Sequence, residues 1–94
     1  MSKRDEYAAK MKQQIDEMNQ NIDELEKKAR EASDSAEKQY EEQVARLRDE
    51  VKQARAKLDE VESASESKWE AVKDEAEKVT EALKKSYNYF KSQL

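Results

Sequence analysis

One apolar or small side chain recurs at almost every helical turn of this chain, and no glycine or proline interrupts the pattern. From Tyr7 to Leu94 the pattern takes 24 steps over 87 residues, a mean of 3.625 residues per step. That spacing is close to the period of an α-helix. A stripe one residue wide per turn is narrower than the face that a helix shows to a globular core, and it is typical of a coiled-coil seam. The sequence therefore predicts an all-α fold made of long helices.

The large side chains of this stripe need a second helix, because so polar a helix is marginal in water on its own. That helix can belong to the same chain or to another copy of it. We expect self-association, with a dimer as the homo-oligomer. The predicted self-association seam consists of Met11, Ile15, Met18, Ile22, Leu25, Tyr40, Val44, Leu47, Val51, Leu58, Val61, Trp69, Val72, Val79, Leu83, Tyr87 and Phe90.

Two zones of the stripe, residues 29–36 and 62–68, lack large apolar side chains and separate three well-filled segments. Both carry the pattern of a helix start, a serine or aspartate followed three residues later by glutamate, and Ser2 with Asp5 resembles such a start at the beginning of the chain. Three arrangements are compatible with these zones. They are a continuous coiled-coil dimer about 140 Å long, a helical hairpin broken near 63–67, and an antiparallel three-helix bundle with a second break near 33–36.

The two zones differ in how strongly they favour a break. Strong helix formers such as Ala29, Ala32 and Ala36 flank the first zone, and neither zone has the glycine, asparagine or proline of most interhelical turns. In the second zone Ser65 occupies the stripe itself, and Trp69 could pack back onto Ala64 if Ser65 were the N-cap. We therefore predict a single coiled-coil domain over 1–94, with a long helix at 1–62, a turn at 63–67 and a second helix at 68–92, as a hairpin that self-associates.

Charge is abundant but evenly spread. Charged residues make up 45% of the chain, and the net charge is −4. Eight acids precede a base by four residues, as in Glu26–Arg30 and Asp74–Lys78, and each such pair favours helix by about 0.2–0.5 kcal/mol. The densest basic group, Lys27, Lys28 and Arg30, is surrounded by acids. We expect no nucleic-acid partner, because such a partner needs basic charge gathered on one face.

Composition removes most enzyme classes. Without cysteine and histidine the chain lacks thiolate chemistry, the commonest metal ligand and the usual acid or base at neutral pH. Its carboxylates lie among lysines and water, which is unsuited to acid–base work. We predict no catalytic residues, no metal site and no cofactor, and hence not an enzyme. The longest apolar run, Tyr7 to Ala9, is far short of a membrane span, and no signal-peptide pattern is present. We expect a cytoplasmic protein without a membrane partner.

Aromatic residues gather near the end of the chain, where Tyr87, Tyr89 and Phe90 fall within four positions. Tyr87 and Phe90 lie on the stripe, whereas Tyr89 is about 200° round the helix from Tyr87. Tyr89 is therefore either an ordinary surface residue or a contact for a third helix or a foreign partner. We take it as the possible partner contact.

Three segments carry a resemblance to known proteins: SKRDEYAAKMKQQIDEMNQNIDELEKKAREA, YEEQVARLRDEVKQARAKLDEVESAS and WEAVKDEAEKVTEALKK. Together they resemble a family of small bacterial coiled-coil proteins of unknown function. In that family the tryptophan tends to follow Ala-Ser-Gly, and a second tryptophan often lies in the last helix. This chain has Glu66 near the glycine position and no second tryptophan. The resemblance implies a turn near 64–67 and implies no activity or catalytic residue.

These observations favour a structural or interaction module that self-associates and can hold or space other proteins. One alternative is reversible binding of an amphipathic helix to a lipid or particle surface. Another is a stress-related protein that folds only when it is dried or bound.

Overall fold

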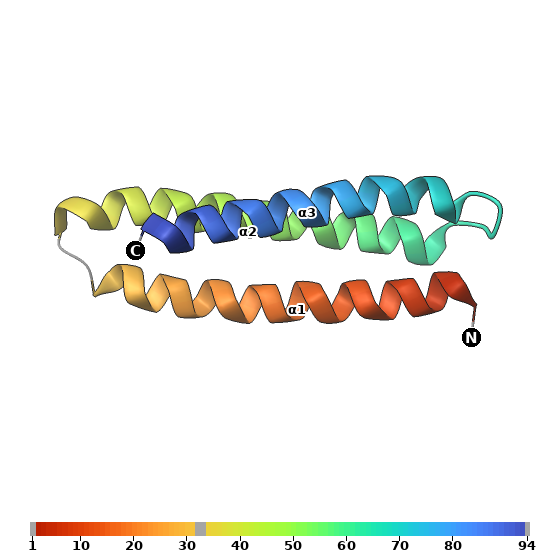
Figure 1. Ribbon diagram of the computed structural model, residues 1–94, viewed down its shortest axis with the longest axis horizontal. Coiled ribbons are helices and arrows are strands. Elements are labelled where there is room, and N and C mark those ends of the chain that lie inside the picture. The colour runs from red at the N-terminus through yellow and green to blue at the C-terminus, as the bar shows by residue number, and fades with distance from the viewer. Residues whose placement is uncertain (1, 32–33, 94) are drawn as a thin grey trace.

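The computed structural model describes residues 2–31 and 34–93, and within that part the side chains of 34–37 are not described. The described residues form three helices, α1 (Lys3–Arg30), α2 (Asp34–Ser63) and α3 (Trp69–Gln93). α1 and α3 run in the same direction, and α2 is antiparallel to both. The N- and C-termini therefore lie at opposite ends of the bundle (Figure 1). The molecule is a short rod with extents of 51 × 18 × 18 Å.

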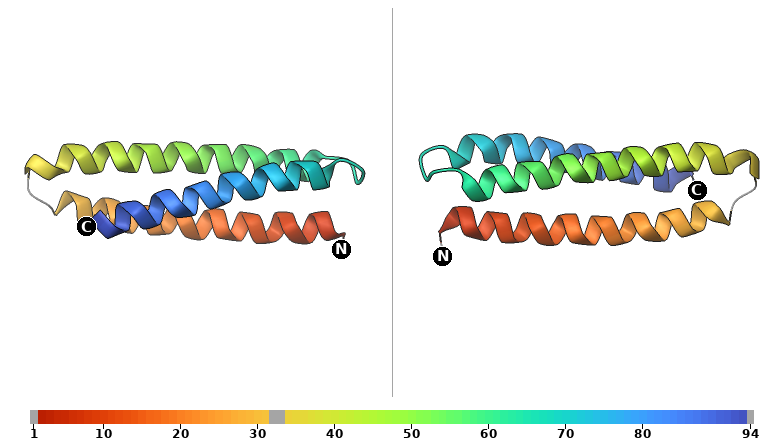
Figure 2. Two further views of the ribbon diagram at one scale, coloured as in Figure 1. Left: turned by 45° about the horizontal axis from the view of Figure 1, so that its top comes forward. Right: turned by 180° about the vertical axis from the view of Figure 1, so that it is seen from behind.

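The predicted stripe forms the core of this rod. From each helix, large side chains such as Ile15, Leu47 and Leu83 are almost completely buried. α2 packs closely along both neighbours, whereas α1 and α3 approach each other more loosely. Figure 2 shows the same arrangement from two further sides, with α3 beside both other helices. The all-α fold is confirmed, and the three-helix bundle is the arrangement that the chain adopts.

The predicted long helix over 1–62 is wrong, because the chain forms two helices there. Ser2 caps the start of α1, and its hydroxyl accepts the backbone N–H of Asp5 at 3.2 Å. α1 ends at Arg30, where the N–H of Glu31 donates to the carbonyl oxygen of Lys28 at 3.2 Å in a tight 3₁₀-type turn. Such an ending needs no glycine, and no described residue has a positive φ. Residues 32 and 33, where the predicted helix would continue, lie outside the described residues.

The predicted turn near 63–67 is present, at residues 64–68 between α2 and α3. The hydroxyl of Ser63 donates to the carbonyl oxygen of Asp59 at 2.8 Å in the last turn of α2. The carbonyl oxygen of Ser65 then accepts the N–H groups of Lys68 and Trp69, both at 3.0 Å. The hydroxyl of Ser65 bonds instead to the hydroxyl of Ser67 at 3.2 Å. Ser65 thus opens the turn that leads into α3 through its backbone, and not through a side-chain cap.

Candidate interaction surfaces

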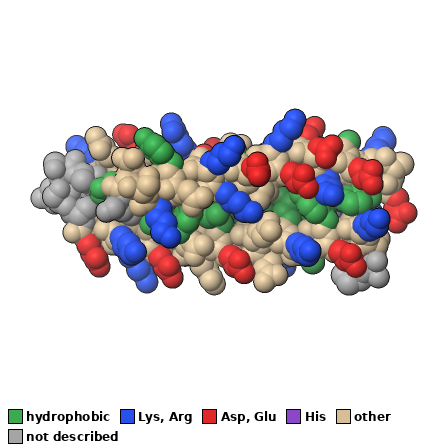
Figure 3. Space-filling view, in the orientation of Figure 1, with side chains coloured by type: hydrophobic (Ala, Val, Ile, Leu, Met, Phe, Trp, Pro, Cys, Tyr) green, Lys and Arg blue, Asp and Glu red, His purple; other side chains and the backbone are tan. Residues whose placement is uncertain are grey.

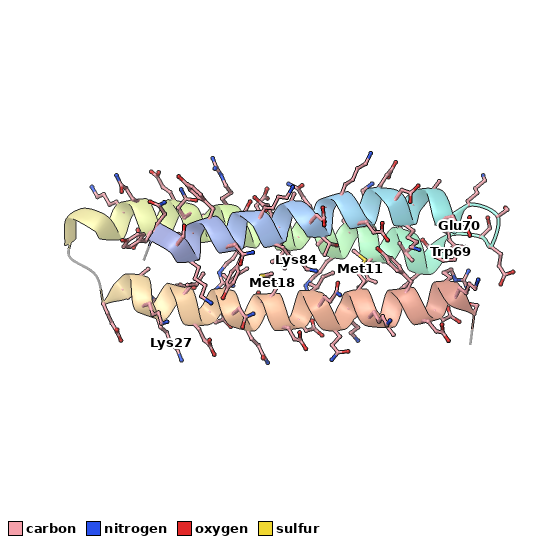
Figure 4. All side chains as sticks on the ribbon, in the orientation of Figure 1. Met11, Met18, Lys27, Trp69, Glu70 and Lys84 are labelled. Atoms are coloured by element: carbon pink, nitrogen blue, oxygen red, sulfur yellow. The ribbon has the colours of Figure 1, made fainter. Side chains whose placement is uncertain are left out.

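All seventeen residues of the predicted seam lie inside the chain's own bundle. Most are buried, and Met18, Tyr40, Val72, Val79 and Tyr87 are partly buried against the same core. Figure 4 shows Met11 and Met18 on the side of α1 that faces the other two helices, whereas Lys27 points away from the bundle. The stripe is therefore covered without a second copy. Any partner must meet the outer faces of the helices.

An aromatic cluster closes the end of the bundle that holds the 64–68 turn. The rings of Tyr7 and Trp69 lie 6.4 Å apart between centroids, at 43° to one another. The ammonium of Lys73 lies 5.4 Å from the first centroid and 5.8 Å from the second, a cation–π arrangement. Arg4 donates from Nη1 to the carbonyl oxygen of Ala64 at 2.7 Å. These contacts join the beginning of α1 to the turn, which gives Trp69 a structural role.

The pKa of Tyr7 follows from this position. Burial raises the pKa of its phenol above the usual 10.0, and the negative charges of Glu77 and Asp74 raise it further. Tyr7 also borders an open groove between α1 and α3, which Gln14 and Thr80 line as well. Apolar side chains show along the line between these two helices, with charged side chains on either side (Figure 3). Because its pKa is raised, the phenol of Tyr7 is neutral at physiological pH and acts as a packing group.

An ion-pair cluster joins α1 to α2. Arg48 donates from Nη2 to Oδ1 of Asp23 at 2.7 Å and to Glu26, and from Nη1 to Oδ1 of Asn19 at 3.4 Å. The hydrogen bond from Arg48 lowers the pKa of the Glu26 carboxyl below its usual 4.5, against the opposing effect of its partial burial. Beside this cluster is a hollow of about 250 Å³ with Ala29 among its lining residues. The arrangement is a surface clasp between two helices.

Charge pairing along the chain differs from the sequence prediction. Of the eight pairs expected four residues apart, Glu26–Arg30 is present at 2.8 Å. The pair Asp34–Lys38 involves the side chain of Asp34, which lies outside the described side chains. Several other bridges cross between helices instead, as in Arg55–Asp16 at 3.0 Å and Lys57–Glu75 at 2.8 Å. Sequence reasoning missed Arg48, Arg55 and Lys57 as interhelical residues. Their partners are 18 to 39 positions away, so no local spacing could have indicated them.

The other end of α3 presents an exposed aromatic ring. Phe90 is fully buried, with its ring 5.7 Å from that of Tyr40 in an edge-to-face arrangement. Its neighbour Tyr89 is 61% exposed, the highest exposure of a large hydrophobic side chain among the described residues. Tyr89 borders a hollow between α2 and α3 whose other side includes Gln39 and Gln43. The residue predicted as a partner contact is thus on the surface and accessible.

The described residues form neither an acidic cluster suited to a metal ion nor a helix suited to crossing a membrane. Within residues 2–31 and 34–93, no three acidic side chains gather as they would around a metal ion. Over the same residues, no helix combines the length and the apolar character that crossing a bilayer requires.

The fold and these surfaces define a class, the small antiparallel three-helix bundle with charged outer faces. Comparison with protein-family models, with curated proteins and with solved structures returned no match for the chain.

Proposed function

We propose that this chain is a non-enzymatic structural module of the cytoplasm, which associates with itself and holds or spaces other proteins through its outer faces. The observation that carries the proposal is Tyr89, a large aromatic ring that is 61% exposed on a helix whose other aromatic residues are at least partly buried. An amphipathic ring that costs little conformational entropy on binding is a common anchor of protein interfaces.

The shape of the molecule supports the same proposal. Because the stripe is covered within one chain, the 51 Å rod can present its outer faces without first unfolding. Interhelical clasps such as Arg48 with Asp23 hold the helices in register. A rod of fixed length with charged sides is suited to spacing or bridging partners.

The experiment compares association of the wild-type chain with that of Tyr89→Ala, by sedimentation equilibrium and by cross-linking in cells. A photo-cross-linking residue placed at position 89 should capture a partner or a second copy. Placed at Lys27, which points away from the bundle, it serves as the matched control (Figure 4). We expect Tyr89→Ala to keep the helix content of the wild type and to weaken association or capture. Equal association of both chains, with equal capture at both positions, would overturn the proposal.

A further inference from the structure

From Asp74 onward, the outer face of α3 carries alternating charges in a regular order. Asp74, Lys78, Glu81 and Lys85 follow one another at steps of four, three and four residues, and all four are exposed. At 100° per residue, each lies within about 40° of the direction opposite to the buried Leu83. These four residues, the α3 charge stripe, therefore lie on the exposed side of α3, where Asp74, Lys78 and Glu81 also border the open groove towards α1.

The contacts of adjacent residues support this orientation. Lys73 lies over the ring of Tyr7 on the α1 side of α3. Ser86 donates to Oε1 of Glu50 at 3.0 Å on the α2 side. In the part of the chain that the structure describes, no member of the α3 charge stripe forms an ion pair. The expected pairs Asp74–Lys78 and Glu81–Lys85 are among those that do not form, so these charges can pair with a partner.

The order of the charges selects the partner and its direction. The stripe reads minus, plus, minus, plus. A second α3 in the antiparallel direction would place Asp74 opposite Lys85 and Lys78 opposite Glu81, so that all four facing pairs have opposite sign. In a parallel pair in register, all four facing pairs would have like sign, which is destabilising.

The whole helix has the same polarity. Residues 69–82 contain five acidic and two basic side chains, whereas residues 83–93 contain three basic and no acidic ones. An antiparallel copy thus sets the acidic half of one α3 against the basic half of the other. In the same register the ring of Tyr89 reaches the exposed methyl group of the partner's Ala71, which lies on the same side of the helix.

We propose that the outer face of α3 is a self-association surface, on which a second copy of this chain docks with its α3 antiparallel about a two-fold axis near residues 79 and 80. This inference rests on the proposed function and names the face that serves it. Such a two-helix contact is small and largely polar. It is therefore a transient interface, with a dissociation constant of roughly 0.1–1 mM at low salt, and it weakens as salt screens the charges.

The test exploits the two-fold symmetry. In the antiparallel dimer, Asp74→Lys or Lys85→Asp alone creates two like-charge contacts, whereas both changes in one chain restore opposite signs. Sedimentation equilibrium at low salt should show about tenfold weaker association for each single variant and recovery to within about threefold of wild type for the double variant. Lys84→Asp makes the same charge change on the α1 side of the helix and should weaken association far less.

A second measurement reports the direction of pairing. Because the chain has no cysteine, Glu70→Cys gives one attachment point for a spin label. In a mixture with isotopically labelled wild type, we expect broadening of the amide signals at residues 85–92 of that wild-type partner. Broadening centred on residues 67–73 would indicate parallel pairing and would overturn the inference.

The outcomes separate this inference from the proposed function. If the wild type associates but the double variant associates no more tightly than the single variants, the chains use another face. The inference then fails while the proposed function stands. If the wild type stays monomeric to about 1 mM at low salt, a concentration at which the expected interface would be well populated, self-association fails altogether. Cross-linking of other proteins at position 89 would then be the remaining support for the module.

Discussion

Two adjacent residues near the end of α3 differ completely in their surroundings. Phe90 is fully buried against Tyr40, whereas Tyr89 is 61% exposed. The sequence predicted this difference in position, because neighbours on a helix differ by 100° in direction and only Phe90 continues the stripe. The two side chains have a similar size, so their substitution isolates the effect of burial.

Phe90→Ala should lower the free energy of unfolding by about 3–5 kcal/mol, since it removes a buried ring and leaves a cavity. Tyr89→Ala should change it by less than about 0.5 kcal/mol, as is usual for exposed positions. Urea denaturation followed by circular dichroism measures both. Similar losses for the two variants would mean that α3 does not pack in the orientation described.

Charge pairing was the residue-scale property that sequence reasoning predicted least well. A spacing of four residues brings two side chains near each other on one helix, but it does not decide which partner each charge takes. Arg48 illustrates this, because its carboxylate partners Asp23 and Glu26 become neighbours only after α1 and α2 pack. Tertiary packing, which the local pattern does not encode, decides the pairing.

The Arg48 clasp should make stability depend on pH. Arg48 lowers the pKa of Glu26 below 4.5, so the clasp stabilises the fold fully above that value, and its contribution is lost as the pH falls through the lowered pKa. Both side chains are partly exposed, so solvent screening keeps the effect small. At pH 7, Arg48→Gln should cost about 0.5–1 kcal/mol. The difference from wild type should shrink below pH 4.5.

Urea denaturation of wild type and Arg48→Gln across this pH range measures the difference. Arg46→Gln is the matched control, because Arg46 is an exposed arginine on the same helix and forms no ion pair with another described residue. A destabilisation by Arg48→Gln that stays the same from pH 7 to pH 3 would rule out the linkage to Glu26.

At the scale of elements, the stripe predicted the helices and one of the two breaks. The break at 64–68 was indicated by a serine on the stripe itself. The other break was kept only as an alternative near 33–36, because the residues around the end of α1 at Arg30 are strong helix formers and no glycine marks a turn. Helix propensities of a few tenths of a kcal/mol per residue are outweighed when a turn lets three stripes cover one another. The local sequence indicates the helix propensity, but it does not indicate the burial that the chain gains when the three helices pack together.

The contact between Arg4 and Ala64 should hold the 64–68 turn in place. Arg4→Gln removes a charge-assisted donor to the carbonyl oxygen of Ala64, so amide hydrogen exchange in the turn should become several-fold faster while the middle of α2 is unchanged. The neighbouring exposed residue provides the control, Lys3→Gln. If both variants exchange alike, Arg4 does not anchor the turn.

At the scale of the whole molecule, the decisive feature is that one chain covers its own stripe. A seam of this kind would ordinarily require a second chain, and the sequence left open which solution is used. Core residues contributed by all three helices, such as Ile22, Val61 and Leu83, are almost fully buried within the single chain. The periodic spacing predicted which residues form the core. It did not predict whether the same chain or a second copy buries them.

The thermal stability of the fold should therefore be nearly independent of protein concentration. An obligate dimer buries its seam only on association, so its midpoint of unfolding rises with concentration, whereas a self-contained bundle unfolds at the same temperature. Circular dichroism in plain buffer should show a helical protein whose midpoint shifts by less than about 2 °C between roughly 5 and 100 µM, because the proposed α3 contact is at most partly populated there and adds less than about 0.5 kcal/mol. A largely unfolded spectrum would instead support folding on drying or binding. A midpoint that climbs steadily with concentration would show that the stripe is shared between chains, and the three-helix bundle would then not be the state in solution.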